Sequence, residues 1–231
     1  SARRFVLIST IDVYPVKQDV DEDTNINLSD LKQAYGRNRY KLELFIKKKF
    51  SNFYIIRCPN LYGINLKKNF LYDLVNNSGL EKRHSQSVLQ YYSLKNLWKD
   101  IQKILRHKIH LVNLSVEPVT CEAIALFTLK RKFVNNTFEP PMILNFKSKY
   151  CKLWKGKNGY MYDAKSTLAD LKRFVIQQKE FTQKPKLSIS NLAWNTHDDS
   201  KVAKILKEND VKFIEIAPSN IWLDPTSQPD K

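Results

Sequence analysis

Apolar residues recur with a helical period in the stretch from Ser29 to Phe50. The positions that share this face are Leu31, Tyr35, Leu42, Phe45 and Ile46. Side chains three, four or seven positions apart lie on one side of a helix, so the pattern predicts an amphipathic helix over residues 29–50. Ser29 has a side chain suited to an N-cap, and Asp30 suits the positive end of the helix dipole.

Short apolar runs on either side of this helix predict buried strands at residues 5–8 and 52–57. The polar, acidic segment 15–28 between the first strand and the helix predicts a loop. A strand, a helix and a strand in this order are the repeating unit of an α/β fold. Further along, we expect a helix that begins near residue 67, a strand at 109–116, a helix at 121–134 entered through Thr120, a strand at 142–146 and a helix at 166–179.

The composition changes at residues 181–185, and a second pattern follows. An alternating strand at 187–194, a helix at 197–209 and a strand at 211–218 predict one βαβ unit. We therefore predict a first domain over residues 1–180, a linker at 181–185 and a second domain over 186–231.

Composition limits the class of protein. Of the 231 residues, 42% are hydrophobic and 12% aromatic, which indicates a globular chain with a hydrophobic core. No apolar run approaches the roughly 18 residues of a membrane span, so we expect no membrane partner. Cys58, Cys121 and Cys151 are odd in number and far apart, which indicates reduced thiols and a cytoplasmic location. His107 and His110 lack an acidic or cysteine partner at ligand spacing, so we expect no metal.

The net charge of +16 is compatible with nucleic acid, an anionic membrane or an anionic small substrate as partner. The basic residues are scattered, and their only clusters are short, at residues 47–49, 67–68 and 130–132. We find no nucleic-acid-binding motif, so we expect a lysine-rich solvated surface and no nucleic-acid partner.

Tyr35 and Arg39 are four residues apart and therefore lie on the same face of the predicted helix. A cation beside a phenol favours the phenolate, and a phenolate near neutral pH can take a proton from an alcohol. A packed tyrosine beside a solvated arginine is the more common reason for this spacing, so the pair alone does not establish the chemistry.

Further motifs before and within the predicted helix add evidence about the role of this pair. The segment FVLISTIDVYP at residues 5–15 is followed by an acidic loop and by AYGRNRYKLE at residues 34–43. This series resembles the extended short-chain dehydrogenase/reductase family, the NAD-dependent sugar epimerases and dehydratases. The resemblance implies that Thr10 holds the substrate hydroxyl and that Tyr35 exchanges its proton. Arg39 stands where the family has a lysine that binds the nicotinamide ribose, and a guanidinium is not interchangeable with an ammonium.

A second motif follows the next predicted strand. Arg57, Asn60 and Gly63 match an Arg-x-x-Asn-x-x-Gly turn of the same family. The resemblance implies that the backbone at Pro59 lies against the nicotinamide and that Asn60 contacts the sugar nucleotide. Asn69 falls where the family often has an asparagine on the substrate. A plain strand-to-loop turn and a helix cap are the structural alternatives.

The resemblance implies a Rossmann-like doubly wound domain that uses NAD or NADP and carries a C-terminal substrate lobe. The five glycines do not form the Gly-rich turn that binds the dinucleotide pyrophosphate. We therefore expect a partial domain: a fragment of a nucleotide-sugar epimerase or dehydratase that is inactive alone. The resemblance also implies a homodimer through the Tyr35 helix as a candidate assembly. The alternatives are a non-catalytic interaction module and, on net charge alone, a basic nucleic-acid-binding protein.

The second predicted domain carries a resemblance of its own. The segments SISNLAW at 188–194 and FIEIAPSNIW at 213–222 resemble the first strands of xylose-isomerase-like TIM barrels, the sugar-phosphate isomerase/epimerase family. That fold needs eight βα units, so the resemblance implies one βαβ unit of an incomplete barrel.

Overall fold

The computed structural model describes residues 4–64, 66–183, 188–190, 194–209, 211 and 213–215, with side chains left out at 179–183, 188–189 and 213–215. The chain divides into two compact units, Ser1–Gln178 and Lys179–Lys231, and each is treated by itself. The domain boundaries expected from the sequence stay a prediction. Among the described residues, no helix has both the length and the apolar composition of a membrane span.

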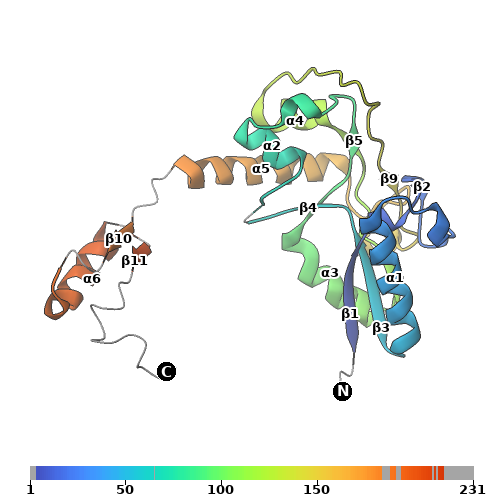
Figure 1. Cartoon of the computed structure of the whole chain (residues 1–231), viewed down its shortest axis with the longest axis horizontal. Coiled ribbons are helices and arrows are strands. Elements are labelled where there is room, and N and C mark those ends of the chain that lie inside the picture. Colours follow the sequence, from blue (N-terminus) through green and yellow to red (C-terminus); the bar gives the residue numbers. More distant parts are fainter. Residues whose placement is uncertain are drawn as a thin grey trace. The chain divides into compact units, whose positions relative to one another are not determined.

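A three-stranded parallel sheet forms the base of the first unit (Figure 1). Its strands are β1 (Phe5–Thr10), β3 (Phe53–Cys58) and β7 (Leu111–Asn113), with β3 in the centre. Thr10 lies opposite Cys58 in the register, so both strands end at the same edge. This edge is the place where open α/β sheets bind ligands.

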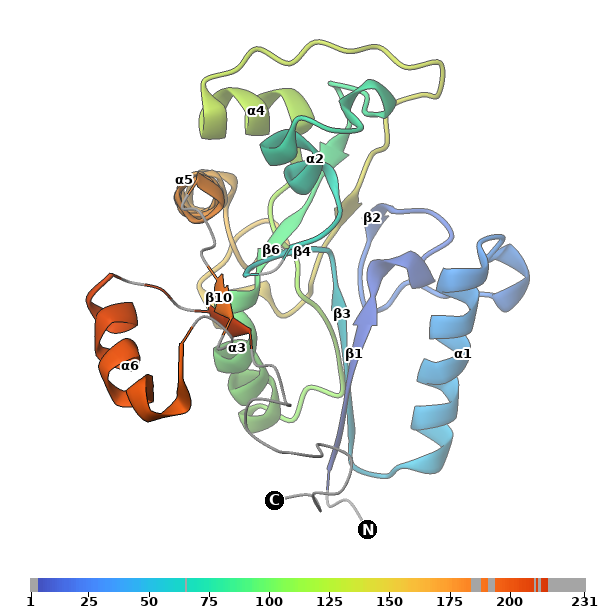
Figure 2. The same cartoon turned by 60° about the vertical axis from the view of Figure 1, so that its left-hand side comes forward.

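Two helices cover opposite faces of this sheet: α1 (Ala34–Lys49) and α3 (Leu94–Arg106) (Figure 2). Ile46 of α1 packs with Ile55, whereas Ile56, the next residue of β3, belongs to the core formed with α3. Successive side chains of a strand point to opposite faces, so a strand covered on both sides must be apolar at consecutive positions. The uninterrupted run in β3 is explained in this way.

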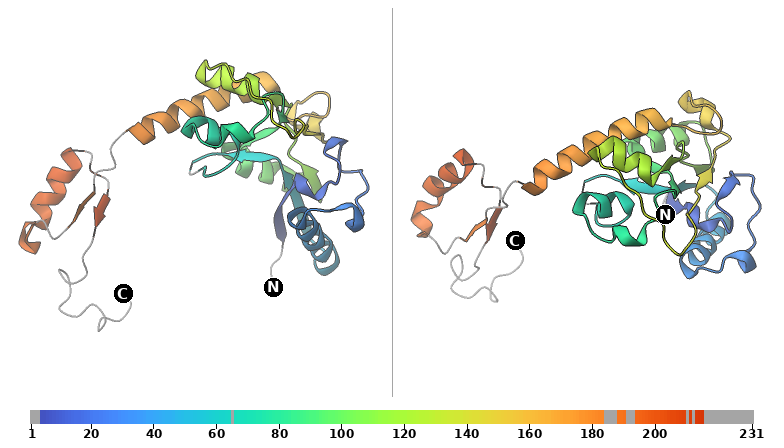
Figure 3. Two further views of the ribbon diagram at one scale, coloured as in Figure 1. Left: turned by 45° about the horizontal axis from the view of Figure 1, so that its top comes forward. Right: turned by 90° about the horizontal axis from the view of Figure 1, so that it is seen from above.

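Shorter elements form a lobe at the carboxyl end of the sheet. β2 (Gln18–Val20) pairs with β9 (Asn145–Phe146) and β4 (Asn60–Tyr62) with β6 (Tyr91–Ser93), both parallel, while β5 (Val88–Leu89) is antiparallel to β8 (Val119–Thr120). The helices are α2 (Phe70–Asn76), α4 (Cys121–Leu129) and α5 (Ala164–Gln183), with 3₁₀ turns at Ile11–Val13, Leu28–Asp30, Leu80–Lys82 and Cys151–Trp154. Helices α4 and α5 lie side by side (Figure 3), and Ile124 of α4 and Leu171 of α5 belong to the same hydrophobic core.

The order of elements agrees with the sequence analysis, and several boundaries do not. The Tyr35 helix begins at Ala34 after a separate 3₁₀ turn, so Ser29 is not its N-cap; its hydroxyl bonds the carboxylate of Asp30 instead. The helix predicted to reach residue 134 ends at Leu129, because Lys130 takes the left-handed conformation. Its predicted cap is confirmed, since the Thr120 hydroxyl accepts the backbone N–H of Ala123 at 3.0 Å.

Three further predictions differ from the structure, because strand pairing joins segments that are distant in the sequence. The loop expected at residues 15–28 contains β2, which pairs with β9 more than a hundred residues later. The strands expected at 109–116 and 142–146 are shorter, at Leu111–Asn113 and Asn145–Phe146. Strand formation there depends on a distant partner that local patterns do not reveal.

The second unit contains β10 (Ser188–Ser190), a 3₁₀ turn at Thr196–Asp198, α6 (Asp199–Glu208) and β11 (Phe213–Glu215). The two strands are parallel neighbours, which agrees with the predicted βαβ unit. Parts of the predicted strands, at residues 187, 191–193, 212 and 216–218, lie outside the described residues. The part of this unit that the structure describes forms no closed barrel, so the barrel prediction is not confirmed.

Candidate functional site

Thr10 ends β1 and caps the 3₁₀ turn that follows it. Its hydroxyl donates to the carboxylate of Asp12 at 3.1 Å and accepts the backbone N–H of Asp12 at 3.2 Å. The Asp12 carboxylate also pairs with the ammonium of Lys17. The hydroxyl that the sequence analysis assigned to a substrate is therefore engaged locally, and a substrate oxygen would have to compete with Asp12 for its proton.

Gly36 places the first turn of α1 directly against this turn. A Cβ at Gly36 would lie 2.0 Å from the backbone oxygen of Asp12, so only glycine allows the close approach. Tyr35, the preceding residue, is 56% exposed at the start of the helix. The guanidinium carbon of Arg39 lies 5.9 Å from the centre of the Tyr35 ring. The spacing that suggested a Tyr–Arg pair does bring the two side chains together.

Arg39 also acts on the end of β3. Burial raises the pKa of the Cys58 thiol to about 12, and the positive charge of Arg39 opposes this shift. Pro59, which follows Cys58, is buried. Because Cys58 lies opposite Thr10 in the sheet, the structure gathers Thr10, Tyr35, Arg39 and Pro59 at one edge.

Asn60 and Asn69 line one cavity of about 260 Å³, together with Lys82, Arg83 and His84. The Asn60 amide donates to the carbonyl oxygen of Gln90 at 3.2 Å. Asn69 caps α2, where its side-chain oxygen accepts the N–H of Tyr72 at 3.2 Å and its amide nitrogen donates to Leu61. The cap that the sequence analysis weighed for Asn69 is present, and it leaves the residue on the wall of the cavity.

Sequence reasoning missed the buried ion pair that fastens α1 to the sheet. Glu43 of α1 and Arg57 of β3 have side chains 0% and 2% exposed, and Arg57 donates to Glu43 at 2.7 Å. The hydroxyl of Ser9 donates to the same carboxylate at 2.6 Å. Burial lowers the pKa of Arg57, but the bonds and charge of Glu43 outweigh burial and leave it raised. One carboxylate therefore connects α1 to both β1 and β3, next to Thr10.

Tyr14 extends this network to the lobe. Its phenol accepts from Arg57 at 2.8 Å and donates to the backbone oxygen of Asp21 at 2.7 Å, and the amide of Asn113 contacts it at 2.9 Å. Burial raises the pKa of Tyr14, which the charge of Arg57 partly opposes. Arg57 was matched to a family turn from the sequence, but no local pattern signals its partners, which lie 14 to 43 residues away.

The described residues at this edge contain no turn suited to a dinucleotide pyrophosphate. A pyrophosphate needs a Gly-rich turn from a strand into a helix. Gly36 lies inside α1, and the other glycines, Gly63, Gly79, Gly156 and Gly159, make no such turn among the described residues. The same residues contain no group of three or more His, Cys, Asp or Glu side chains that could hold a metal ion.

No protein-family profile and no curated protein matches this sequence. Solved structures do match. A dTDP-4-dehydrorhamnose reductase from Clostridium acetobutylicum has a TM-score of 0.58 at 20% identity over 76% of this chain and 66% of that chain. A UDP-galactose 4-epimerase has a TM-score of 0.53 at 16% identity over 78% and 64%. A short-chain dehydrogenase/reductase superfamily protein from Agrobacterium tumefaciens with bound NAD has 0.55 at 13% identity over 79% and 70%.

These similarities define the class by its fold. The fold is the Rossmann-like α/β fold of the short-chain dehydrogenases/reductases that includes the nucleotide-sugar epimerases, dehydratases and reductases. The Rossmann-like α/β fold predicted from the sequence is thereby confirmed. This chain spans slightly less than two thirds of the length of the reductase and of the epimerase.

Proposed function

We propose that this chain is part of a nucleotide-sugar epimerase, dehydratase or reductase that uses NAD or NADP. The observation that carries the proposal is the gathering of Thr10, Tyr35, Arg39 and Pro59 at the carboxyl edge of a parallel sheet. The fold that this chain shares with such enzymes also supports the proposal.

Each side chain has a distinct part in this proposal. Tyr35 is exposed and removes the proton of the sugar hydroxyl, and Arg39 stabilises the negative charge that develops on the phenol oxygen. The Thr10 hydroxyl orients the sugar hydroxyl after it exchanges its hydrogen bond to Asp12 for one to the substrate. Lys17 then remains as the partner that balances the charge of Asp12. Tyr35, Arg39 and the backbone at Pro59 would hold the ribose and nicotinamide of a dinucleotide, which when bound would supply hydride transfer from or to the sugar carbon.

The nucleotide sugar occupies the cavity that Asn60 and Asn69 line. Lys82, Arg83 and His84 border it, and Lys82 is exposed, so a diphosphate can reach a cation there. Arg83 is held by an ion pair to Asp73 at 2.6 Å, which fixes its guanidinium. Charge-assisted bonds to phosphate are stronger than neutral ones, so Lys82 and Arg83 would each strengthen the binding of a diphosphate.

Binding of UDP-glucose and dTDP-glucose, followed by calorimetry, tests the substrate part. We expect Lys82→Gln to weaken binding about threefold to tenfold, because one exposed charge-assisted contact is lost. Lys68→Gln is the matched control, since Lys68 is also exposed and does not line the cavity. Equal weakening by both variants, or no saturable binding by the chain, would contradict the assignment.

We further propose that this chain alone forms no tight complex with NAD or NADP and has little turnover, because its residues provide no pyrophosphate turn. Calorimetry with either dinucleotide tests this directly, and a micromolar complex would refute it. The same titration on the longest natural reading frame that contains this sequence shows whether further residues supply the turn.

The rate of turnover in that longer protein tests the proposed role of Tyr35 as the general base. General acid–base groups contribute about 100-fold or more, so Tyr35→Phe should lower the rate by at least that factor. Tyr40→Phe is the control, because Tyr40 lies on the same helix and packs against the core. A folded, cofactor-free protein without turnover would favour the non-catalytic module instead.

The assembly state is a separate proposal. Leu42 and Phe45 are exposed on α1, and an apolar helix face of this kind suits a homodimer. Light scattering of the wild type and of Phe45→Ser tests it, and a monomer at all concentrations would refute it.

A further inference from the structure

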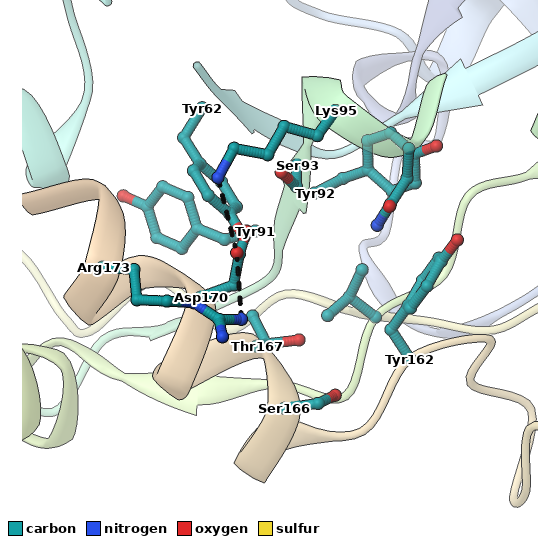
Figure 4. A pocket seen from close by; sticks show the side chains of 12 residues that line it. Tyr62, Tyr91, Tyr92, Ser93, Lys95, Tyr162, Ser166, Thr167, Asp170 and Arg173 are labelled. Carbon is teal, nitrogen blue, oxygen red and sulfur yellow. Dashed lines mark hydrogen bonds and ion pairs between the residues drawn. The ribbon is translucent and has the colours of Figure 1, made fainter. Parts of the chain in front are cut away.

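A second cavity lies at the carboxyl ends of β4 and β6 (Figure 4) and has a volume of about 210 Å³. Tyr62 ends β4 and lies opposite Ser93, which ends β6. The buried ring of Tyr91 is the one side chain that this cavity has in common with the cavity of Asn60 and Asn69. Its volume is many times what a single water molecule needs, so it has room for a small molecule.

Thr167, in the first turn of α5, places a polar group on the cavity wall. Its side chain is only 6% exposed and lines the cavity. Its hydroxyl makes no hydrogen bond with any residue that the structure describes, whereas Thr128 on α4 bonds the carbonyl oxygen of its own helix at 2.6 Å. Every fully buried side-chain nitrogen or oxygen among the described residues has a hydrogen-bond partner, so the Thr167 hydroxyl is open to the cavity and can donate to a molecule bound there.

The charges around the cavity are unbalanced. Asp170 binds the ammonium of Lys95 at 3.7 Å and the guanidinium of Arg173 at 3.3 Å through the same oxygen, and its other oxygen accepts from Tyr62 at 2.7 Å. Two cations therefore face one carboxylate. Their side chains are 59% and 68% exposed, so both can turn towards a ligand while Asp170 keeps them near the opening.

A helix N-terminus adds further donors. Ser93 is the N-cap of α3, a helix of 13 residues, and makes no capping hydrogen bond to it. The first backbone N–H groups of a helix have no partner within the helix and carry partial positive charge, which favours an anion. Lys95 and Asn96, in the first turn of α3, line the same cavity.

We propose that this cavity binds the phosphate group of a small phosphorylated molecule. The Thr167 hydroxyl and the N–H groups at the start of α3 donate hydrogen bonds to it, and Lys95 and Arg173 balance its charge. The phenol rings along the wall contact the rest of the molecule. This site is independent of the nucleotide-sugar function proposed above.

Titration of the full chain with inorganic phosphate at neutral pH tests the site. Ionic strength must be held constant, because a net charge of +16 attracts any anion weakly. We expect saturable binding that Thr167→Val weakens about fivefold, the value of one hydrogen bond, and that Arg173→Gln weakens about tenfold. Thr167→Ser keeps the hydroxyl and should retain binding. Lys165→Gln, an exposed residue of α5 outside the cavity, should bind as the wild type does.

The outcomes separate the proposal from its rivals. Binding that does not saturate, or that Lys165→Gln weakens as much as Arg173→Gln, means general attraction to a basic surface and overturns it. Equal affinity for acetate would assign the cavity to carboxylates instead. Thr167→Val should bind UDP-glucose normally, so loss of both ligands would indicate misfolding. Its melting temperature without phosphate checks this, and we expect it to be close to that of the wild type, because the Thr167 hydroxyl makes no hydrogen bond with a described residue.

Discussion

Gly36→Ala tests whether the contact between α1 and the turn after β1 sets the geometry of the proposed active site. An added Cβ would lie 2.0 Å from the backbone oxygen of Asp12, and real contacts of this kind essentially never fall below 3.0 Å. The helix or the turn must therefore move by about 1 Å. Backbone oxygen cannot turn aside as a flexible side chain can, so Tyr35 and Thr10 shift relative to each other.

Two effects of opposite sign determine the stability of this variant. Alanine is better than glycine inside a helix by about 1 kcal/mol. Overpacking in a tight contact costs roughly 1–3 kcal/mol, and a contact with backbone belongs at the upper end. We therefore expect a net loss of about 2 kcal/mol, measured by urea unfolding followed by circular dichroism.

A control on the same helix isolates the clash. Asn38 is exposed on α1, and Asn38→Ala should raise stability by a few tenths of a kcal/mol from helix propensity alone. In a protein with measurable turnover, a displacement of about 1 Å should lower the rate by up to about 100-fold. A Gly36→Ala protein more stable than the wild type would refute the close contact and the reasoning from it.

Three further predictions concern buried and half-buried carboxylates. Glu43→Gln should cost about 3–5 kcal/mol in urea unfolding, because it leaves the buried Arg57 without its counter-charge, and a loss below about 1 kcal/mol would contradict this. Asp100→Asn should cost about 1.5–3 kcal/mol and alter the fluorescence of Trp154, whose indole donates to Asp100 at 2.7 Å; unchanged fluorescence would argue against that bond. Burial acts to raise the pKa of Asp170, but its hydrogen bonds and neighbouring cations lower it overall. Its contribution to stability is therefore present above the unfolded pKa of about 4 and is lost as the pH falls through the lower folded value. Asp170→Asn should flatten the stability curve in acid, and an unchanged curve would refute this.

Much of the fold could be predicted from local pattern. The apolar runs at β1 and β3 indicate strands, because burial on both faces requires apolar residues at consecutive positions. The helix predicted around Tyr35 exists, but its predicted apolar face was largely wrong: Tyr35, Leu42 and Phe45 are exposed, and α1 buries Gly36, Glu43 and Ile46. The pairing of Tyr35 with Arg39 could also be predicted, since residues four apart on a helix are neighbours. The order of motifs predicted that the candidate residues lie at the carboxyl edge of the sheet, where β1 and β3 do end together.

The remaining features depend on segments that are distant in the sequence. The Glu43–Arg57–Ser9 contacts join residues 14 and 34 positions apart, and β2 exists because β9 lies beside it. Neither the ion-pair network nor the β2–β9 pairing produces a periodic pattern in the sequence. The engagement of Thr10 by Asp12 is local, but the direction of a hydroxyl depends on its surroundings and not on its spacing.

By itself, the sequence determined an α/β chain, the position of a Tyr–Arg helix after a strand ending in Thr10, and the absence of a Gly-rich turn. Only the tertiary structure decided that Asn60 and Asn69 share one cavity and that Thr167, Lys95 and Arg173 surround another. The physical reason is that local pattern reports which side of an element is buried. Cavities and charge networks arise where several elements meet, and their members are chosen by packing in three dimensions.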